Sequence, residues 1–138
     1  MSEPKADSSG PGKSGKASIY VVDDEPMLLE LASVILEPLG YVIETFRAPE
    51  SALRAFQAAR PQPALIITDY AMHTMTGLQL AGACRRIQPK QKVLLLSGTV
   101  GPEIVRTGPT KPDRFLAKPY EAKQLIDAVR SLLADGAD

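Results

Sequence analysis

The chain has few of the residues that would mark a secreted, membrane-bound or nucleic-acid-coating protein. It is 138 residues long with a single cysteine, Cys84, so no disulfide can form within it, which fits a reducing compartment. The formal net charge is +0, which favours neither a nucleic-acid-binding surface nor a membrane-seeking one. No apolar run approaches the roughly 20 residues that cross a bilayer, and residues 1–16 contain no apolar segment resembling a secretory signal. We therefore expect a cytoplasmic protein without membrane insertion or direct nucleic-acid contact.

The composition that remains is that of one globular domain preceded by a polar tail. A hydrophobic content of 44% is ordinary for a folded protein, and the length suffices for a single core. Residues 1–17 are rich in Ser, Gly, Pro and Lys and have almost nothing to bury, so we expect a flexible tail there. Residues 18–138 are expected to form the folded domain.

From residue 18 onward, short apolar runs alternate with amphipathic segments, which predicts strands alternating with helices. Strands are predicted at residues 18–22, 41–46, 64–68, 92–96 and 114–117, and helices at 26–37, from 49, at 77–87 and at 121–134. The third and fourth strands read as continuous apolar runs and do not alternate, which is typical of parallel strands buried on both faces. The predicted fold class is therefore α/β, with helices covering both faces of a five-stranded parallel sheet.

The spacing of apolar residues predicts the buried face of each helix. The predicted core residues are Leu28, Leu31, Ala32 and Ile35 in the first helix, Ala52, Leu53 and Phe56 in the second, Leu80, Cys84 and Ile87 in the third, and Leu125, Ala128, Val129 and Leu132 in the last. Residues 99–112 contain two glycines and three prolines. We expect only a short or distorted helix there, at about residues 102–107.

Polar side chains follow four of the five predicted strands. Asp23 and Asp24 follow the first strand, Asp69 the third, Ser97 the fourth and Lys118 the fifth. An open α/β sheet places its binding site at the carboxyl ends of its strands, so these side chains should converge. Three converging carboxylates repel one another unless a cation joins them, and a hard ion with oxygen ligands such as Mg²⁺ meets that need. The pattern predicts a metal-assisted phosphate site.

Asp69 is the candidate nucleophile of this site. A carboxylate of ordinary pKa is already ionised at pH 7, so it needs no general base, and its attack on a phosphoryl group would give an acyl phosphate. Mg²⁺, the Ser97 hydroxyl and the Lys118 ammonium could each neutralise one phosphoryl oxygen. The chain's one histidine, His73, is not required, and we expect it to be exposed and without a catalytic role.

Each of these residues also has an ordinary structural interpretation when taken alone. Asp24 could cap the following helix, Ser97 could lie in a common turn, and Lys118 could be a solvated surface lysine. Their joint placement at successive strand ends favours the functional interpretation.

The residues at 21–26 and 69–77, with the pairs Ser97-Gly98 and Lys118-Pro119, resemble the receiver domain of two-component response regulators, and the chain resembles a single-domain, chemotaxis-type regulator. The resemblance extends from residue 18 to about 134. It implies a flavodoxin-like, doubly wound sheet with strand order 2-1-3-4-5, an order that comes from the family's known fold.

The resemblance also implies a role for each site residue. Asp69 would accept the phosphoryl group. Mg²⁺ would be bound by Asp69, directly by Asp24, largely through water by Asp23, and by the backbone carbonyl of Ala71. Lys118 would pair with a phosphoryl oxygen.

Two further residues would form the switch of such a domain. The Ser97 hydroxyl would be drawn towards the phosphoryl group, and the Phe115 rotamer would follow it. Phe115 lacks the hydroxyl of the commoner Tyr and would report by packing alone, while His73 stands where the family usually has Pro.

The resemblance implies a phosphorylation-dependent signalling switch, not an enzyme. Its phosphodonor would be a histidine kinase or a phosphotransfer protein, and its output protein is unidentified. We expect a monomer or weak dimer whose output is made by protein contact, by onward relay or by a further domain, because no DNA-binding segment follows the last helix. Two alternatives remain: a docking module that is not phosphorylated, and an aspartyl-phosphate phosphatase, which would need a second acid where Ala71 stands.

Overall fold

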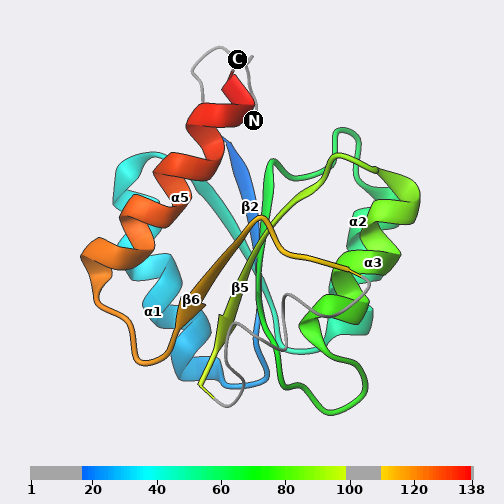
Figure 1. Ribbon diagram of the computed structural model, residues 1–138, viewed down its shortest axis with the longest axis horizontal. Coiled ribbons are helices and arrows are strands. Elements are labelled where there is room, and N and C mark those ends of the chain that lie inside the picture. The colour runs from blue at the N-terminus through cyan, green and yellow to red at the C-terminus, as the bar shows by residue number, and fades with distance from the viewer. Residues whose placement is uncertain (1–16, 99–109, 138) are drawn as a thin grey trace, which may run out of the picture.

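The protein forms a parallel five-stranded sheet with helices on both faces (Figure 1). The structure, a computed structural model, describes residues 17–98 and 110–137. The strands are β2 (Ser18–Val22), β3 (Val42–Phe46), β4 (Leu65–Asp69), β5 (Lys92–Ser97) and β6 (Arg114–Ala117), and the helices are α1 (Pro26–Leu36), α2 (Pro49–Ala58), α3 (Gly77–Ile87) and α5 (Ala122–Ala137), with a 3-10 turn η1 (Glu37–Leu39) after α1. The strand order is β3-β2-β4-β5-β6, which is 2-1-3-4-5 in chain order. The predicted fold class and strand order are confirmed.

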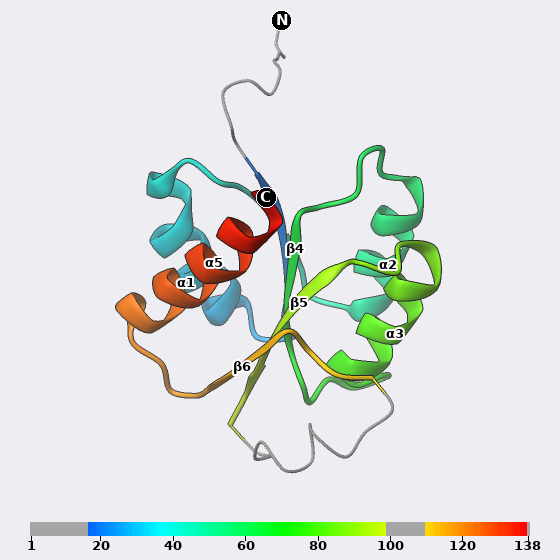
Figure 2. The same cartoon turned by 45° about the horizontal axis from the view of Figure 1, so that its top comes forward.

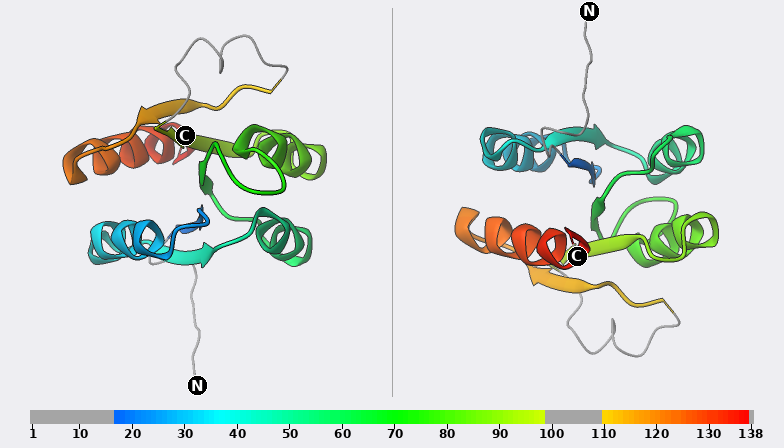
Figure 3. Two further views of the ribbon diagram at one scale, coloured as in Figure 1. Left: turned by 90° about the horizontal axis from the view of Figure 1, so that it is seen from below. Right: turned by 90° about the horizontal axis from the view of Figure 1, so that it is seen from above.

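The helices form two layers with the sheet between them. Helices α1 and α5 cover one face, and α2 and α3 cover the other, as the views along the sheet show (Figures 1 and 3). All pairings between neighbouring strands are parallel, so the carboxyl ends of the strands meet at one edge, the lower one in Figure 1. Figure 2 shows the connections that follow β4 and β6 at this same edge. This edge is where the polar residues were predicted to converge.

The alternation of side chains along each strand divides the core in two. On β2, Ile19 and Val21 enter the cluster packed against α1 and α5, whereas Tyr20 and Val22 enter the cluster packed against α2 and α3. Strand β4 is buried along its whole length. Leu65 and Ile67 enter the cluster packed against α1 and α5, and Ile66 enters the one packed against α2 and α3, so these three successive residues are all apolar.

Helix α1 turns a different face to the core from the predicted one. Its fully buried residues are Leu29, Ala32 and Leu36, whereas Leu28 and Ile35 are only partly buried. Leu31, predicted to be buried, is 43% exposed, and that prediction is wrong. The prediction fails because α1 is apolar on nearly every side, so periodicity alone does not single out one face.

The other helical faces agree better with the prediction. All four predicted residues of α5 are buried, and so are Ala52, Phe56, Leu80 and Cys84, while Leu53 is only partly buried. Ile87 is exposed, and the prediction that it is buried is wrong. It is the last residue of α3, where the helix leaves the sheet.

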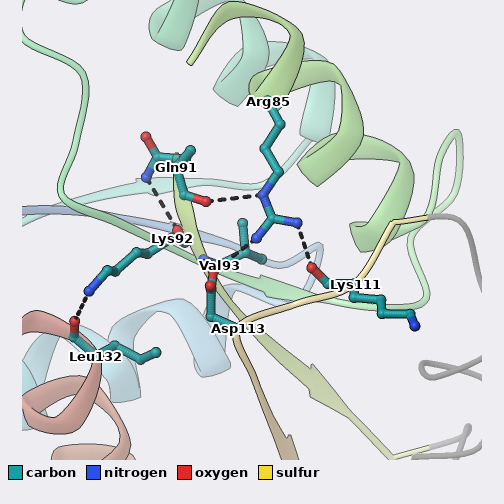
Figure 4. A network of polar contacts seen from close by, with 7 residues as sticks. All are labelled: Arg85, Gln91, Lys92, Val93, Lys111, Asp113 and Leu132. Carbon is teal, nitrogen blue, oxygen red and sulfur yellow. Dashed lines mark hydrogen bonds and ion pairs between the residues drawn. The ribbon is translucent and has the colours of Figure 1, made fainter. Parts of the chain in front are cut away.

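The amino ends of β5 and β6 are tied to α3 by one side chain, Arg85 (Figure 4). Its Nε donates to the carbonyl oxygen of Gln91 at 3.0 Å, its Nη2 donates to the Asp113 carboxylate at 2.9 Å, and its Nη1 donates to the carbonyl oxygen of Lys111. The same Asp113 oxygen accepts the backbone N–H of Val93 at 2.7 Å. The chain entering β6 is therefore fixed to α3 at the edge of the sheet opposite the strand carboxyl ends.

Two predictions concern segments outside the described residues. The expected tail at 1–17 falls outside them except for Ala17, and so does the expected helix at about 102–107. Within residues 17–98 and 110–137, none of the helices combines the length and apolar character needed to traverse a bilayer.

Candidate functional site

The strand ends bring three carboxylates and one ammonium together, as predicted. One carboxylate oxygen from each of Asp23, Asp24 and Asp69 lies within 4.8 Å of the others. The Nζ of Lys118 lies 3.0 Å from Oδ1 of Asp69 and 3.3 Å from Oδ2 of Asp23. The Lys118 side chain is only 19% exposed, so it is not a solvated surface lysine.

Asp23 and Asp24 take different places although they are neighbours in the sequence. Asp23 is buried, and its Oδ1 accepts the backbone N–H of Glu25 at 3.0 Å. The Asp24 side chain is 28% exposed and lies at the outer rim of the site. Asp24 does not cap α1, because the capping residue is Glu25, which makes no side-chain capping bond. Asp23 is thus the inner carboxylate of the pair and Asp24 the outer one.

Asp69 is the last residue of β4, whereas the prediction placed it directly after the strand. It pairs in register with Leu96 of β5 and is 8% exposed. The next residue, Tyr70, donates its N–H to the Leu96 carbonyl at 2.8 Å and accepts the N–H of Gly77 at 2.8 Å. A Cβ on Gly77 would lie 2.3 Å from the carbonyl oxygen of Asp69. Only glycine therefore fits where α3 begins against the end of β4.

The charges of Asp69 and Lys118 influence each other through burial and contact. Burial raises the pKa of Asp69 above its ordinary value, and the neighbouring Lys118 ammonium only partly offsets this. Burial acts to lower the pKa of Lys118, but its hydrogen bond to Asp69 and the charges of Asp23 and Asp69 outweigh burial, so the pKa of Lys118 is raised. The site therefore keeps its ammonium, and three carboxyl groups face that one cation.

The two predicted switch residues lie on neighbouring strands. Ser97 is buried at the end of β5, opposite Ala117, and its carbonyl accepts the Lys118 N–H at 2.9 Å. It is part of the strand, so the turn interpretation of Ser97 is wrong. Phe115 is half-buried on β6, opposite Leu95. The switch roles of Ser97 and Phe115 stay predictions.

Ala71 is exposed in the connection that follows Asp69. Its role as a metal ligand, through its backbone carbonyl, also stays a prediction.

Sequence reasoning missed two neighbours of the site. The Nδ1 of His73 lies 3.2 Å from Oδ2 of Asp24, although the His73 side chain is 90% exposed, as expected. Tyr120 lies near Lys118 and Asp23, and burial raises the pKa of its phenol. The only feature of the sequence that could have indicated Tyr120 as a neighbour of the site is its position two residues after Lys118. For His73, that feature is its presence at a position where the family usually has Pro.

The donor atoms suit a hard divalent cation. The three carboxylates supply only oxygen, the ligand type that Mg²⁺ takes, and their separations allow one ion to be reached by more than one of them. Lys118 neutralises one of the carboxylates, and a cation would remove the remaining repulsion.

Comparison with known proteins agrees with this geometry. The family model of the response regulator receiver domain matches residues 19–130. The transcriptional regulatory protein TcrX of Mycobacterium tuberculosis is 32% identical over 117 residues, which are 84% of this chain and 49% of TcrX. GlrR of Escherichia coli is 31% identical over 123 residues, which are 88% of this chain and 27% of GlrR. The chain thus spans about half or less of the length of these curated relatives.

Solved structures of similar length match almost completely. The chemotaxis protein CheY4 of Vibrio cholerae superposes with a TM-score of 0.76 at 27% identity, covering 85% of this chain and 98% of CheY4. TrrA of Thermotoga maritima, solved with Mg²⁺ and BeF, gives a TM-score of 0.74 at 30% identity and covers 84% of this chain and 98% of TrrA. The fold, the strand-end carboxylates and the match over residues 19–130 lead to one conclusion: this chain belongs to the response regulator receiver domain family of two-component signalling.

Proposed function

We propose that Asp69 accepts a phosphoryl group from the phosphohistidine of a histidine kinase or a phosphotransfer protein. The observation that carries this proposal is the contact of Asp69 with Lys118 at 3.0 Å, beside two further carboxylates whose oxygens lie within 4.8 Å. Receiver domains of this family act with such donors in two-component systems. The role is that of a phosphorylated regulator and not of an enzyme with a separate substrate.

The transfer balances without a general base. A carboxylate oxygen of Asp69 bonds to phosphorus as the bond from phosphorus to the donor's imidazole nitrogen breaks, and that nitrogen keeps the electron pair. The product is an acyl phosphate on Asp69. Lys118, which contacts both Asp23 and Asp69, can then pair with an oxygen of the added phosphoryl group.

Asp23, Asp24 and Asp69 would hold the Mg²⁺ of this reaction, with the Ala71 carbonyl as a further ligand. Bound there, Mg²⁺ supplies charge neutralisation for the phosphoryl oxygens. The oxygen-only donor set supports this assignment, and the related TrrA was solved with Mg²⁺ and BeF.

Ser97 and Phe115 would convert phosphorylation into a change of surface. Ser97 is buried at the end of β5, and Phe115 lies on β6 only two residues before the residue that pairs with Ser97. A small displacement of Ser97 towards Asp69 would therefore open space beside β6, which Phe115 could fill. The result is a shift between two populated states.

The phosphodonor would dock on the outer face of α1, which we call the α1 stripe and define as Met27, Leu31 and Val34. These residues are 81%, 43% and 62% exposed and recur at the i, i+4 and i+7 spacing of one helical face. The α1 stripe begins three residues after Asp24, so a partner helix lying on it would end beside the site. Exposed apolar side chains gathered on one face suit contact with an amphipathic helix.

Phosphorylation can be tested with a small phosphodonor and Mg²⁺. The wild type should gain the mass of one phosphoryl group, Asp69→Asn should gain none, and the exposed matched control Asp127→Asn should label like the wild type. Undiminished labelling of Asp69→Asn would show that another residue is the acceptor. Absence of labelling in the wild type would favour the unphosphorylated docking module.

Docking can be tested separately with autophosphorylated histidine kinases as donors. Val34→Glu should slow transfer from a kinase that phosphorylates the wild type, while its labelling by the small phosphodonor stays unchanged. Val42→Glu, at a similarly exposed valine on β3 outside the α1 stripe, is the control and should transfer normally. Equal slowing by both variants would contradict docking on α1.

A further inference from the structure

His73 lies against the outermost carboxylate of the site. Its Nδ1 is 3.2 Å from Oδ2 of Asp24, and 90% of its side chain is exposed, so the imidazole contacts the site at its solvent rim. The next residue, Thr74, donates its hydroxyl hydrogen to Glu50 of α2. Thr76 caps α3 through reciprocal hydrogen bonds with Gln79. The connection that carries His73 is thus held at both α2 and α3.

The charges inside the site direct a bound cation towards that rim. The Lys118 ammonium contacts Asp23 and Asp69 on the inner side, at 3.3 Å and 3.0 Å. A divalent cation is repelled by this ammonium and is therefore best placed on the side of Asp24, the most exposed of the three carboxylates. His73 is the neighbour on that side. A cation at Asp24 would otherwise complete its coordination there with water.

The separation of the two donor atoms fits adjacent ligands of one ion. Neighbouring ligands of an octahedral ion with bonds of about 2.1 Å are about 3.0 Å apart. The Nδ1 of His73 and Oδ2 of Asp24 are 3.2 Å apart. Imidazole suits transition-series cations, whereas Mg²⁺ prefers oxygen, and affinity for nitrogen-containing sites rises from Mn²⁺ along the first transition series.

We propose that His73 is a ligand, through its imidazole, of a divalent cation held at Asp24, and that it makes this site favour transition-series cations such as Mn²⁺ over Mg²⁺. The inference rests on the proposed metal site and adds a nitrogen donor to its oxygen set. His73 then acts as a residue that determines cation specificity.

The single histidine of the chain makes the test direct. Tag-free protein is loaded with Mn²⁺ alone, and pulsed electron paramagnetic resonance is used to detect an imidazole nitrogen bound to the ion. Such a nitrogen can come only from His73. The wild type should show the nitrogen coupling, and both His73→Ala and His73→Gln should lack it.

Affinities measured on the same proteins separate ligation from a general effect on the site. The signal of free Mn²⁺ gives the affinity for Mn²⁺, and displacement by Mg²⁺ gives the affinity for Mg²⁺. His73→Ala should weaken Mn²⁺ binding at least about tenfold, because the loss of a residue that only supports a metal ligand already costs about 10–100-fold in affinity. Its Mg²⁺ affinity should change less than about twofold, because Mg²⁺ accepts water in place of nitrogen. Asp127→Asn, on the exposed side of α5 away from the site, should keep the nitrogen coupling.

Three results would overturn the inference: no nitrogen coupling in the wild type, equal weakening of both cations by His73→Ala, or a coupling that persists in Asp24→Asn. The phosphorylation experiment reports on the proposed function independently. A wild type that shows the nitrogen coupling but accepts no phosphoryl group would retain the inference and overturn the proposed function.

Discussion

Replacing Lys118 by alanine removes an ammonium that contacts two buried carboxyl groups. Lys118 lies 3.0 Å from Asp69 and 3.3 Å from Asp23, and its side chain is 19% exposed. Without it, Asp23 and Asp69 remain close to each other and to Asp24 but have lost the ammonium that contacts both of them. The folded state should therefore lose stability in the absence of metal, while the unfolded state is little affected.

The magnitude follows from the two short contacts. Each pair has a Coulomb energy of about 5 kcal/mol at these distances with an effective dielectric constant of about 20. The cost of removing the groups from water offsets most of this energy, and deleting one partner of a buried pair costs about 3–5 kcal/mol. Because the Lys118 side chain is partly exposed, we expect Lys118→Ala to lose an amount at the lower end of this range, about 3 kcal/mol. The free energy of unfolding of a typical domain is about 5–15 kcal/mol in total.

The loss of stability can be measured by urea unfolding, followed by far-ultraviolet circular dichroism. The measurement is made at neutral pH, first with a chelator and then with Mg²⁺. Mg²⁺ at a hundred times its dissociation constant stabilises a folded state by about 2.7 kcal/mol. The ion should stabilise Lys118→Ala more than the wild type, because the repelling ammonium is gone. The difference in stability between Lys118→Ala and the wild type should therefore narrow when Mg²⁺ is present.

Lys123→Ala is the matched control, since Lys123 pairs with Asp127 at 2.9 Å on the exposed side of α5. That exposed helical pair should contribute less than about 0.5 kcal/mol. The reasoning would be refuted if Lys118→Ala cost no more than Lys123→Ala, or if Mg²⁺ stabilised the Lys118 variant less than it stabilises the wild type.

Three other predictions concern the support of the site. Gly77→Ala should displace the end of β4 and reduce both stability and labelling of Asp69, because its Cβ would lie 2.3 Å from the Asp69 carbonyl, whereas Gly82→Ala on the same helix should leave labelling unchanged. Arg85→Met and Asp113→Asn should each lower the free energy of unfolding by about 1–2 kcal/mol, measured by urea unfolding. Because the two side chains contact each other, the double variant should lose less than the sum of the two single losses. Strictly additive losses would contradict the contact. Burial raises the pKa of Asp69, so its contribution to stability is complete below its unfolded pKa and is lost as pH rises through the folded pKa. Asp69→Asn should therefore gain stability relative to the wild type between acidic and neutral pH in metal-free urea titrations, and a pH-independent difference would contradict this sign.

The convergence of Asp23, Asp69 and Lys118 could be predicted from the sequence because the geometry of a parallel sheet determines where its strand ends lie. Apolar runs buried on both faces identify parallel strands, and parallel strands collect their carboxyl ends at one edge. The small error at Asp69, which ends β4 instead of following it, arises because pairing with Leu96 extends the strand by one residue.

Other features depend on contacts between segments that are far apart in the chain. The buried face of α1 could not be identified because apolar residues surround that helix, and the core turned out to select Leu29 and Leu36. The contact of Arg85 with Asp113 joins residues 28 positions apart through a long flexible side chain. The approach of His73 to Asp24 depends on the path of the connection after β4. Local periodicity carries no information about such contacts.

The shortness of β6 has a consequence for how molecules of this protein can associate. β6 is an edge strand of only four residues, with Pro112 before it and Pro119 after it. A free strand edge is a template for adding a strand from another molecule, but proline has no N–H to offer to such a ladder. The prolines limit intermolecular strand pairing at this edge to a few hydrogen bonds. This edge is therefore poorly suited to open-ended, sheet-extending aggregation, and contacts between molecules at this edge must rely mostly on side chains.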